Sequence, residues 1–329
     1  MNSIPGEPMI TTIMPTYRRP KLLRKAIISV LNQTYPHFQV CVYDNASGDE
    51  TPDIVAEIAR EDPRVKYHCH SENIGGIANF NYGMKKVTSP FFSLLSDDNT
   101  LLPKFFEDAI YSLNQHPEAV LYAGQTVGIH EKSGKSDYTN EWDAGLVFPP
   151  DGLLNIIERD LPASIDGVLF RRDVRDSIGV FDPSFNGAVD QDYMMRIARN
   201  HIFCISKNHC VLFLYHDDNW TSKRDLEEIV TTRKKILERW CNDDGLSEDI
   251  KQRIKNAYKL YVKNVISSAV IMKCILGDDR ATISTARKIM MKEVGFSFKP
   301  LRAIIIAEAA SRSHFLKKII SRMLRKMVS

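Results

Sequence analysis

Short apolar runs alternate with amphipathic segments through the first 130 residues of the chain. β-branched and aromatic residues gather in runs bounded by turn residues, which is typical of buried strands. The predicted strands are Met9–Met14, Phe38–Tyr43, Val65–His70, Phe91–Leu95 and Val120–Val127. Apolar residues between these runs recur at helical spacing, and they predict helices over Lys21–Leu31, Asp53–Arg60 and Ile77–Val87. Strands that alternate with helices indicate right-handed crossovers, so we expect an α/β fold with a mostly parallel central sheet.

The pattern changes twice in the rest of the chain. Residues 130–150 are rich in Ser, Gly, Asp and Asn, and they predict a long loop of the kind that is often functional. Regular patterns return at Ile165–Phe170. A helical pattern follows near Gln191–Asn200, and strand-like runs follow at Ile202–Ile205 and Cys210–Tyr215. Strand signals become rare after Trp220. We therefore expect one domain over residues 1–220 and a helical C-terminal region over residues 221–329.

Composition narrows the class of protein. The 329 residues carry 44 Lys and Arg against 41 Asp and Glu, and a net charge of +3 is too small to indicate a nucleic acid as the partner of the whole molecule. The six cysteines form no CxxC pair, which argues against a disulfide framework and a thiolate zinc site. No apolar run approaches the roughly 18 residues of a membrane span, and residues 1–8 do not resemble a secretory signal. These features predict a cytoplasmic protein.

Polar residues that could bind a ligand or take part in catalysis follow the predicted strands. Ligands of α/β sheets bind at the carboxyl ends of strands. Residues 15–19 follow the first strand without the GxGxxG of a dinucleotide site, which disfavours a nicotinamide dehydrogenase. Residues 44–49 follow the second strand as an acceptor-rich turn. This turn either caps the next helix or offers the Asp44 carboxylate to a nucleobase.

Three further clusters allow two interpretations each. Asp97 and Asp98 follow the fourth strand, and adjacent carboxylates either form an ordinary turn or bind a divalent cation that also holds phosphates. The segment from Asp190 to Asp192 begins a predicted helix, where a carboxylate is either a cap or a general base. His216 follows the last strand and is either structural or a metal or phosphate contact.

In order and spacing, these segments resemble the inverting nucleotide-sugar glycosyltransferases of family 2, which have the GT-A fold. The resemblance covers residues 9–220. It rests on Pro15-Thr16-Tyr17-Arg18-Arg19, Leu31-Asn32-Gln33-Thr34-Tyr35-Pro36, the Asp44–Asp49 loop, Glu72-Asn73-Ile74-Gly75 with Asn81-Tyr82-Gly83, Ser96-Asp97-Asp98 and Gln191-Asp192. Arg18, Phe80 and Gln191 depart from the family's usual Asn, Arg and Glu.

The resemblance implies a role for each matching residue. Asp44 would contact the uracil or thymine ring, Asp97 the ribose or sugar, and Asp192 would be the catalytic base. Asp98 and His216 would bind Mn²⁺ or Mg²⁺. The other residues that would contact the donor nucleotide are Pro15, Thr16, Tyr17, Arg19, Asn73 and Gly75.

The implied activity is metal-dependent, inverting transfer of one sugar from a UDP- or dTDP-sugar to a hydroxyl of a glycan or lipid-linked acceptor, in bacterial surface-polysaccharide assembly. Processive relatives carry membrane spans and a Gln-x-x-Arg-Trp motif, whereas this chain has Ile236 before Arg239-Trp240 and no span. Two alternatives remain. A nucleotidyltransferase that makes nucleotide sugars would need a glycine-rich phosphate loop, and residues 15–19 contain no glycine. An inactive GT-A-like scaffold would be favoured by loss of Asp98 or Asp192, and both are present.

The C-terminal end carries a distinct amphipathic pattern. The last 16 residues contain five basic residues and no acidic one, and over residues 314–327 apolar side chains share one helical face. This pattern is typical of a helix at the surface of an anionic membrane, or of a helix packed on its own domain with a solvated basic face. The first interpretation would make the protein peripheral on the inner face of the plasma membrane.

Overall fold

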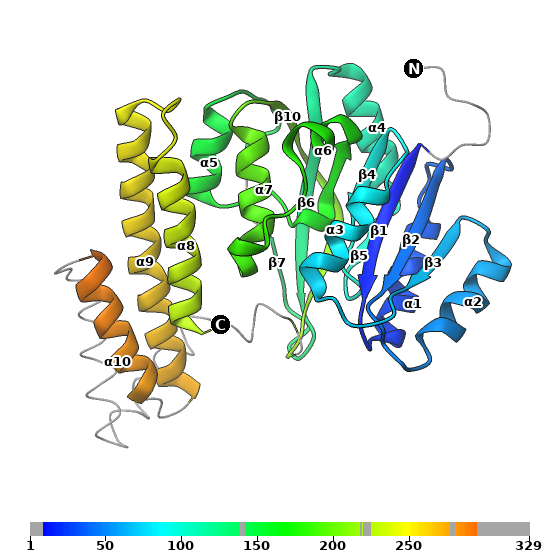
Figure 1. Cartoon of the computed structure of the whole chain (residues 1–329), viewed down its shortest axis with the longest axis horizontal. Helices are drawn as coiled ribbons and strands as arrows, with labels where there is room; N and C mark the ends of the chain where they lie inside the picture. The colour runs from blue at the N-terminus through cyan, green and yellow to red at the C-terminus, as the bar shows by residue number, and fades with distance from the viewer. Residues whose placement is uncertain (1–8, 139–141, 218, 220–224, 277–279, 295–329) are drawn as a thin grey trace. The chain divides into compact units, whose positions relative to one another are not determined.

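The computed structural model describes residues 9–138, 142–217, 219, 225–276 and 280–294. The chain forms two compact units, Met1–Asn219 and Trp220–Ser329 (Figure 1). Each unit is built from its own secondary-structure elements.

The first unit opens with four strands that pair in parallel, in the order β3-β2-β1-β4. Its first elements are β1 (Ile10–Thr16), α1 (Pro20–Leu31), β2 (Phe38–Asp44), α2 (Thr51–Glu61), β3 (Val65–Cys69), α3 (Gly76–Lys86) and β4 (Phe91–Leu94). Every residue of β1 is buried because this strand lies between β2 and β4. The predicted strands and helices of this segment are confirmed, although β1 extends two residues beyond Met14 and so includes Pro15 and Thr16.

The same sheet continues beyond β4 with different pairing. The next elements are β5 (Thr100–Leu101), α4 (Phe105–Gln115), β6 (Ala119–His130), β7 (Ser136–Tyr138), β8 (Gly145–Val147), α5 (Asp151–Arg159), β9 (Val168–Arg171), α6 (Arg172–Ile178), α7 (Val189–Ala198) and β10 (Ile202–Tyr215). Two short 3₁₀ helices, Ile165–Gly167 and Pro183–Ala188, precede β9 and α7. Strand β9 lies between β4 and β6 and is antiparallel to both, while β6 and β10 are parallel. The sheet is therefore mixed, and the expectation of a mostly parallel sheet holds for its β3-β2-β1-β4 half.

Some predictions for residues 100–215 were wrong. The long loop expected over residues 130–150 contains β7 and β8, which pair with β6 and β10. The two strand-like runs after residue 202 are one strand, β10, whose register against β6 shifts between Ile202 and Val211. Helices α4, α5 and α6 were not anticipated. Because β10 is long and irregular, a break in its apolar pattern does not mark the end of the strand.

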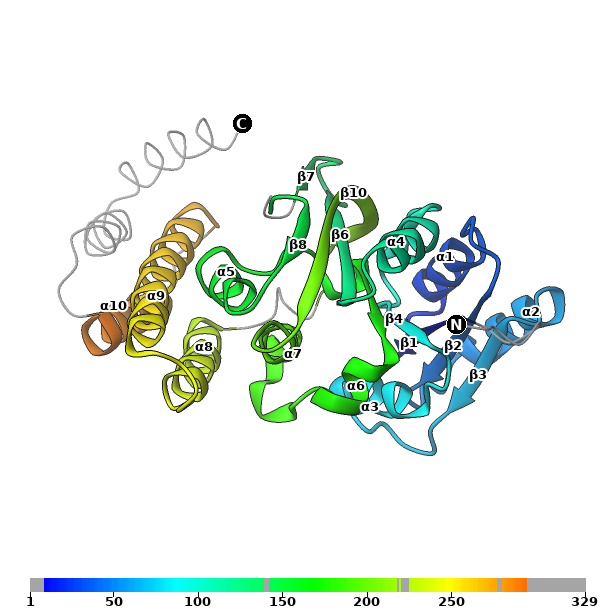
Figure 2. The same ribbon diagram turned by 90° about the horizontal axis from the view of Figure 1, so that it is seen from above.

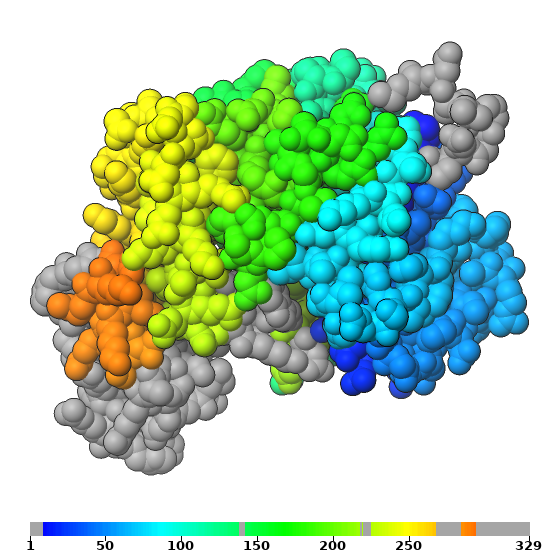
Figure 3. Space-filling view, in the orientation of Figure 1, coloured from blue at the N-terminus to red at the C-terminus, as the bar shows by residue number. Residues whose placement is uncertain are grey.

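Helices cover both faces of this sheet. Figure 2 shows α1 and α4 on one face and α3, α6 and α7 on the other. On the second face the side chains of α3 lie beside those of the segment that follows β9 (Figure 3). Asn81 of α3 exchanges two hydrogen bonds of 2.9 Å with the backbone of Phe181, and Arg175 donates to the carbonyls of Met84 and Val87. These contacts hold α3 against the segment that contains α6 and the residues before α7.

The second unit is helical in its described part. It contains α8 (Leu226–Cys241), α9 (Glu248–Leu276), α10 (Arg280–Ile289) and a π-helix over Met290–Val294. Its apolar core includes Val230, Tyr258, Val262, Ile266 and Ile289. No helix in the described part of the chain is both long enough and apolar enough to cross a bilayer. The predicted amphipathic helix over residues 314–327 lies outside the described residues.

Candidate active site

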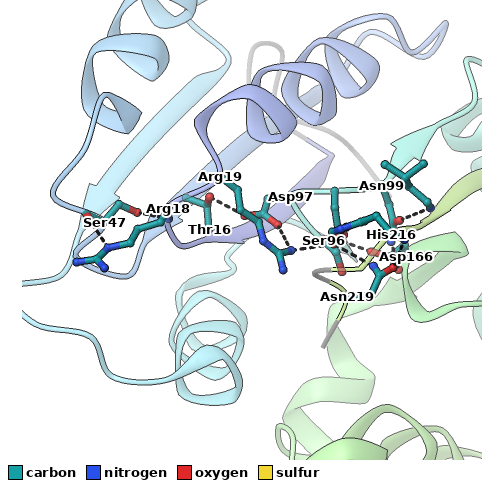
Figure 4. A network of polar contacts seen from close by, with 12 residues as sticks. Thr16, Arg18, Arg19, Ser47, Ser96, Asp97, Asn99, Asp166, His216 and Asn219 are labelled. Atoms are coloured by element: carbon teal, nitrogen blue, oxygen red, sulfur yellow. Dashed lines mark hydrogen bonds and ion pairs between the residues drawn. The ribbon is translucent and has the colours of Figure 1, made fainter. Parts of the chain in front are cut away.

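The end of β1 and the turn after β4 bring a basic residue to two acidic ones (Figure 4). Thr16 donates a hydrogen bond of 2.7 Å to Asp97, and Arg19 contacts Asp97 at 3.2 Å and Asp98 at 2.8 Å. Burial raises the pKa of Asp97 to about 6, although Thr16 and Arg19 act in the opposite direction. The Thr16 hydroxyl and the Arg19 guanidinium therefore favour the ionised form of the buried Asp97 carboxyl.

The end of β10 contributes a histidine to the same cluster. The Nε2 atom of His216 lies 3.1 Å from an oxygen of Asp98, and the Asn219 amide donates to that oxygen at 3.4 Å. Asn219 also accepts a hydrogen bond from the backbone N–H of His216. The side chains of Asp98 and His216 are each 8% exposed. The structure thus brings together a carboxylate and an imidazole that lie far apart in the sequence.

The Asp98 and His216 side chains suit a divalent cation only as part of a larger ligand set. Carboxylate oxygen and imidazole nitrogen are both ligands of Mn²⁺, and Mg²⁺ is usually bound through one or two carboxylates together with substrate phosphates. No group of three or more His, Cys, Asp or Glu residues that could hold a metal occurs among the described residues. Asp98 and His216 therefore fit a cation whose remaining ligands come from a diphosphate and water.

Asp44, the predicted contact for the base, ends β2 in a closed environment. Its side chain is buried, and one of its oxygens accepts hydrogen bonds from the N–H and hydroxyl of Ser47. The other oxygen accepts from the Tyr67 hydroxyl at 2.6 Å and from the Cys69 thiol at 3.7 Å. A base N–H would have to compete with these donors. The arrangement also fits the alternative interpretation from the sequence, in which this carboxylate stabilises the turn.

The neighbouring residue, Asn45, connects two segments that the sequence placed near the donor. Its amide donates to the Asn73 side chain at 2.9 Å, and its oxygen accepts from the Ile74 N–H at 2.8 Å. Asn73 also accepts from the N–H of Gly75, whose φ of 87° favours glycine just before α3. Sequence reasoning missed Asn45 because the adjacent Asp44 offered the more familiar chemistry.

The remaining donor candidates lie in the turn after β1. Pro15 and Thr16 are buried as the last residues of that strand, while Tyr17 is 38% exposed and lies 5.0 Å below the Arg18 guanidinium. Arg18 has a φ of 56° and donates from its backbone and side chain to Ser47. These bonds join the turn after β1 to the turn after β2.

The two carboxylates at the start of α7 lie in different environments. The Asp192 side chain is 0% exposed and pairs with the Nε of Arg196 at 2.9 Å, one helical turn further on. Arg196 also donates to the carbonyls of Ile178 and Val180, so this ion pair holds the segment before α7. The spacing of four residues between Asp192 and Arg196 is typical of an ion pair on one face of a helix.

Asp190 is partly exposed to solvent, and the pKa of its carboxyl lies above the ordinary value. Burial raises the pKa of its carboxyl to about 6, and the negative charges of Asp160 and Asp166 act in the same direction. Asp166 in turn interacts electrostatically with Asp98. Asp190 is thus connected electrostatically to Asp98 through Asp166, and a carboxylate with a pKa of about 6 is suited to accept a proton near neutral pH.

Sequence comparisons identify the relatives of this chain. Residues 11–178, about half of the chain, match the family description "Glycosyl transferase family 2". An uncharacterised glycosyltransferase of Rickettsia typhi is 29% identical over 201 residues, which cover 58% of this chain and 59% of the relative. A GalNAc(5)-diNAcBac-PP-undecaprenol β-1,3-glucosyltransferase of Campylobacter jejuni is 34% identical over 96 residues, 29% of this chain and 31% of that protein. The match thus spans less than two thirds of the length of either relative.

Solved structures share the fold. TarS of S. aureus in complex with UDP-GlcNAc has a TM-score of 0.65 at 17% identity, with 96% of this chain and 91% of that chain covered. The mannosyltransferase PcManGT from Pyrobaculum calidifontis in complex with GDP-Man and Mn²⁺ has a TM-score of 0.56 at 16% identity, with 96% and 88% covered. At this level of identity the likeness concerns the fold alone.

Proposed function

We propose, since the chain belongs to glycosyltransferase family 2, that it transfers one sugar from a UDP- or dTDP-sugar to an acceptor hydroxyl with inversion at the anomeric carbon. The observation that carries this proposal is the cluster of Asp97, Asp98, Arg19 and His216 at the carboxyl edge of the sheet. An edge of this kind is where α/β folds bind nucleotides. TarS has been solved with UDP and with UDP-GlcNAc, which supports a uridine donor here.

We further propose that Asp98 and His216 hold Mn²⁺ or Mg²⁺ together with the diphosphate of the donor. When bound, such a cation stabilises the negative charge of the departing nucleoside diphosphate. Arg19 already lies within 2.8 Å of Asp98 and supplies positive charge at the same place. Asp97, held by Thr16, remains as an acceptor for a ribose or sugar hydroxyl.

For the catalytic base we propose Asp190 in preference to Asp192, the residue predicted from the sequence. A base must be reachable by the acceptor hydroxyl and must change protonation state at a useful pH. Asp192 is wholly buried and paired with Arg196, whereas Asp190 is partly exposed and has a pKa of about 6. Deprotonated Asp190 would take the proton of the acceptor hydroxyl as the oxygen attacks the anomeric carbon from the face opposite the leaving diphosphate.

We propose that the acceptor is a glycan or a lipid-linked molecule of bacterial surface-polysaccharide assembly. The undecaprenol-linked substrate named for the C. jejuni relative supports this proposal.

We propose that the helical unit brings the protein to an anionic membrane. Between Asp249 and the end of α9 there are six Lys or Arg residues and no acidic residue. Lys255 and Lys259 are exposed, as is the apolar Leu260 at 57%. Basic residues near an anionic surface contribute about 1 kcal/mol each to binding.

The test is incubation of the purified protein with UDP- and dTDP-sugars, Mn²⁺ and extracted lipid-linked acceptors. We expect release of nucleoside diphosphate that depends on the acceptor, and a glycosidic product whose anomeric configuration, measured by NMR, is opposite to that of the donor. Formation of nucleotide sugar from a sugar 1-phosphate and a nucleoside triphosphate would support the nucleotidyltransferase alternative. Absence of both nucleotide binding and turnover would support the scaffold alternative.

A further inference from the structure

Asp166 is a buried carboxylate for which neither the sequence nor the proposed chemistry gives a role. It lies in the 3₁₀ helix before β9, and the residue is 2% exposed. One of its oxygens accepts a hydrogen bond of 2.6 Å from the backbone N–H of Ser96. The other accepts from the Asn99 amide at 3.1 Å and from the Ser164 hydroxyl. Asp166 thus holds the residues on either side of the Asp97-Asp98 pair.

Asn99 carries the connection onward to the strand that ends before His216. Its amide group donates to Asp166, while its oxygen accepts a hydrogen bond of 3.1 Å from the backbone N–H of Leu214 in β10. Leu214 precedes His216 by two residues. A continuous chain of hydrogen bonds therefore connects the segment before β9, the turn after β4 and the end of β10 (Figure 4).

We propose that Asp166 and Asn99 are positioning residues that set the separation of Asp98 and His216 and so determine the affinity for the cation. The inference rests on the proposed function, because it concerns the cation that Asp98 and His216 would share. Burial is costly for a carboxylate and raises the pKa of Asp166, so an apolar or amide side chain would be the simpler choice for packing alone. Neighbours that orient metal ligands typically change metal affinity by about 10- to 100-fold when they are mutated.

The pattern of hydrogen-bond donors and acceptors requires a carboxylate at position 166 when an amide is at position 99. In Asp166→Asn, one oxygen becomes an NH₂ group, which must face either the Ser96 N–H or the Asn99 amide. Both of these groups are donors, so one of the two bonds is lost in either orientation. Rotation of Asn99 does not repair the loss, because its oxygen is needed by the Leu214 N–H.

Exchanging the two residues restores complementarity. In the double variant Asp166→Asn with Asn99→Asp, the new amide at 166 donates to the new carboxylate at 99 and still accepts from Ser96 N–H. The carboxylate at 99 accepts from Leu214 N–H, and the Ser164 hydroxyl accepts from the second hydrogen of the amide. The exchange keeps the number of charges constant and repairs the connection that each single change breaks.

The experiment measures Mn²⁺ binding in the presence of saturating UDP, by electron paramagnetic resonance of free Mn²⁺, for the wild type, both single variants and the exchanged pair. Asp173→Asn in α6 is the matched control, because Asp173 is exposed. Circular dichroism and thermal unfolding report folding of each variant. We expect the single variants to raise the dissociation constant about 10-fold or more, and the exchanged pair to return to within about threefold of the wild type.

Two outcomes overturn the inference while leaving the proposed function in place. In the first, the wild type binds Mn²⁺ with UDP and folded Asp166→Asn binds it equally well. In the second, the exchanged pair, although folded, binds no better than either single variant. Failure of the wild type itself to bind Mn²⁺ with UDP contradicts the proposed donor site, and with it the role of the positioning pair.

Discussion

His216 and Asp98 lie 3.1 Å apart, measured from the Nε2 atom to the carboxylate oxygen, although 118 positions separate them in the sequence. The contact joins the turn after β4 to the end of β10. In the sheet these two strands are separated by β9 and β6, so their final turns must converge for the side chains to meet. This convergence is what turns two isolated polar residues into a candidate cation site.

Substitution of either residue is expected to weaken metal-dependent binding of the donor. Asp98→Asn removes the negative charge that attracts a cation, and His216→Ala removes the imidazole ligand. In isothermal titration with UDP and Mn²⁺ we expect a loss of affinity of at least about 10-fold for each variant. Asp217→Asn is the control, since Asp217 is exposed and pairs with Lys132. Unchanged affinity in Asp98→Asn would argue against this site.

Asp190→Asn should mainly reduce the rate of catalysis, whereas Asp192→Asn should mainly reduce the stability of the fold. Loss of a general base typically reduces kcat by about 10²- to 10⁴-fold, which we expect for Asp190→Asn with donor binding retained. Asp192→Asn leaves Arg196 without its buried partner, and breaking a buried ion pair costs about 3–5 kcal/mol of unfolding free energy. The measurements are steady-state kinetics and thermal unfolding of both variants. A stable, inactive Asp192→Asn beside an active Asp190→Asn would restore the assignment made from the sequence.

The pH dependence of kcat/KM should follow Asp190. Because a base must be deprotonated, activity should fall as pH decreases through about 6, the value to which burial and its acidic neighbours raise the pKa of this carboxyl. Asp160 contributes to that rise, and it also accepts a hydrogen bond from the Gln191 amide. Asp160→Asn removes the negative charge, so the acidic limb should move to lower pH. A shift to higher pH, or no shift, would contradict Asp190 as the titrating base.

The lysines of α9 should determine binding to anionic lipid. Sedimentation with vesicles that contain phosphatidylglycerol should retain the wild type at low salt and release it at high salt. Lys255→Glu with Lys259→Glu should reduce this binding, while Lys104→Glu with Lys21→Glu in the first unit serves as a control of equal charge change. Equal binding of the two double variants would show that the lysines of α9 do not determine binding to anionic lipid.

The strands and helices of the β3-β2-β1-β4 part of the sheet could be predicted from the sequence. Each of these strands is a short apolar run, and a helix precedes the next strand. The part after residue 100 could not be predicted in the same way, because β9 enters antiparallel between β4 and β6 and β10 continues across an irregular stretch. Such pairings depend on contacts between distant segments. A local pattern of apolar residues does not specify them.

The acidic pair at residues 97 and 98 was identified from its position after a strand, and the structure adds the contacts of that pair with Arg19 and His216. Asp166, Asn99 and Asn45 were missed, because nothing in their local sequence distinguishes a buried connecting side chain from an ordinary turn residue. The proposal of Asp190 as the base in place of Asp192 likewise rests on the burial of each side chain, which the sequence does not show.

The most direct test of the account is binding of UDP, dTDP and their sugars to the wild type and to Asp98→Asn, with and without Mn²⁺, measured by thermal shift. Ligands that bind the native state raise its melting temperature according to their concentration and affinity. The account predicts a shift with uridine or thymidine diphosphate compounds that increases with Mn²⁺ and that loses its metal dependence in the variant. A shift of equal size in Asp98→Asn, or no shift with any nucleotide, would contradict it.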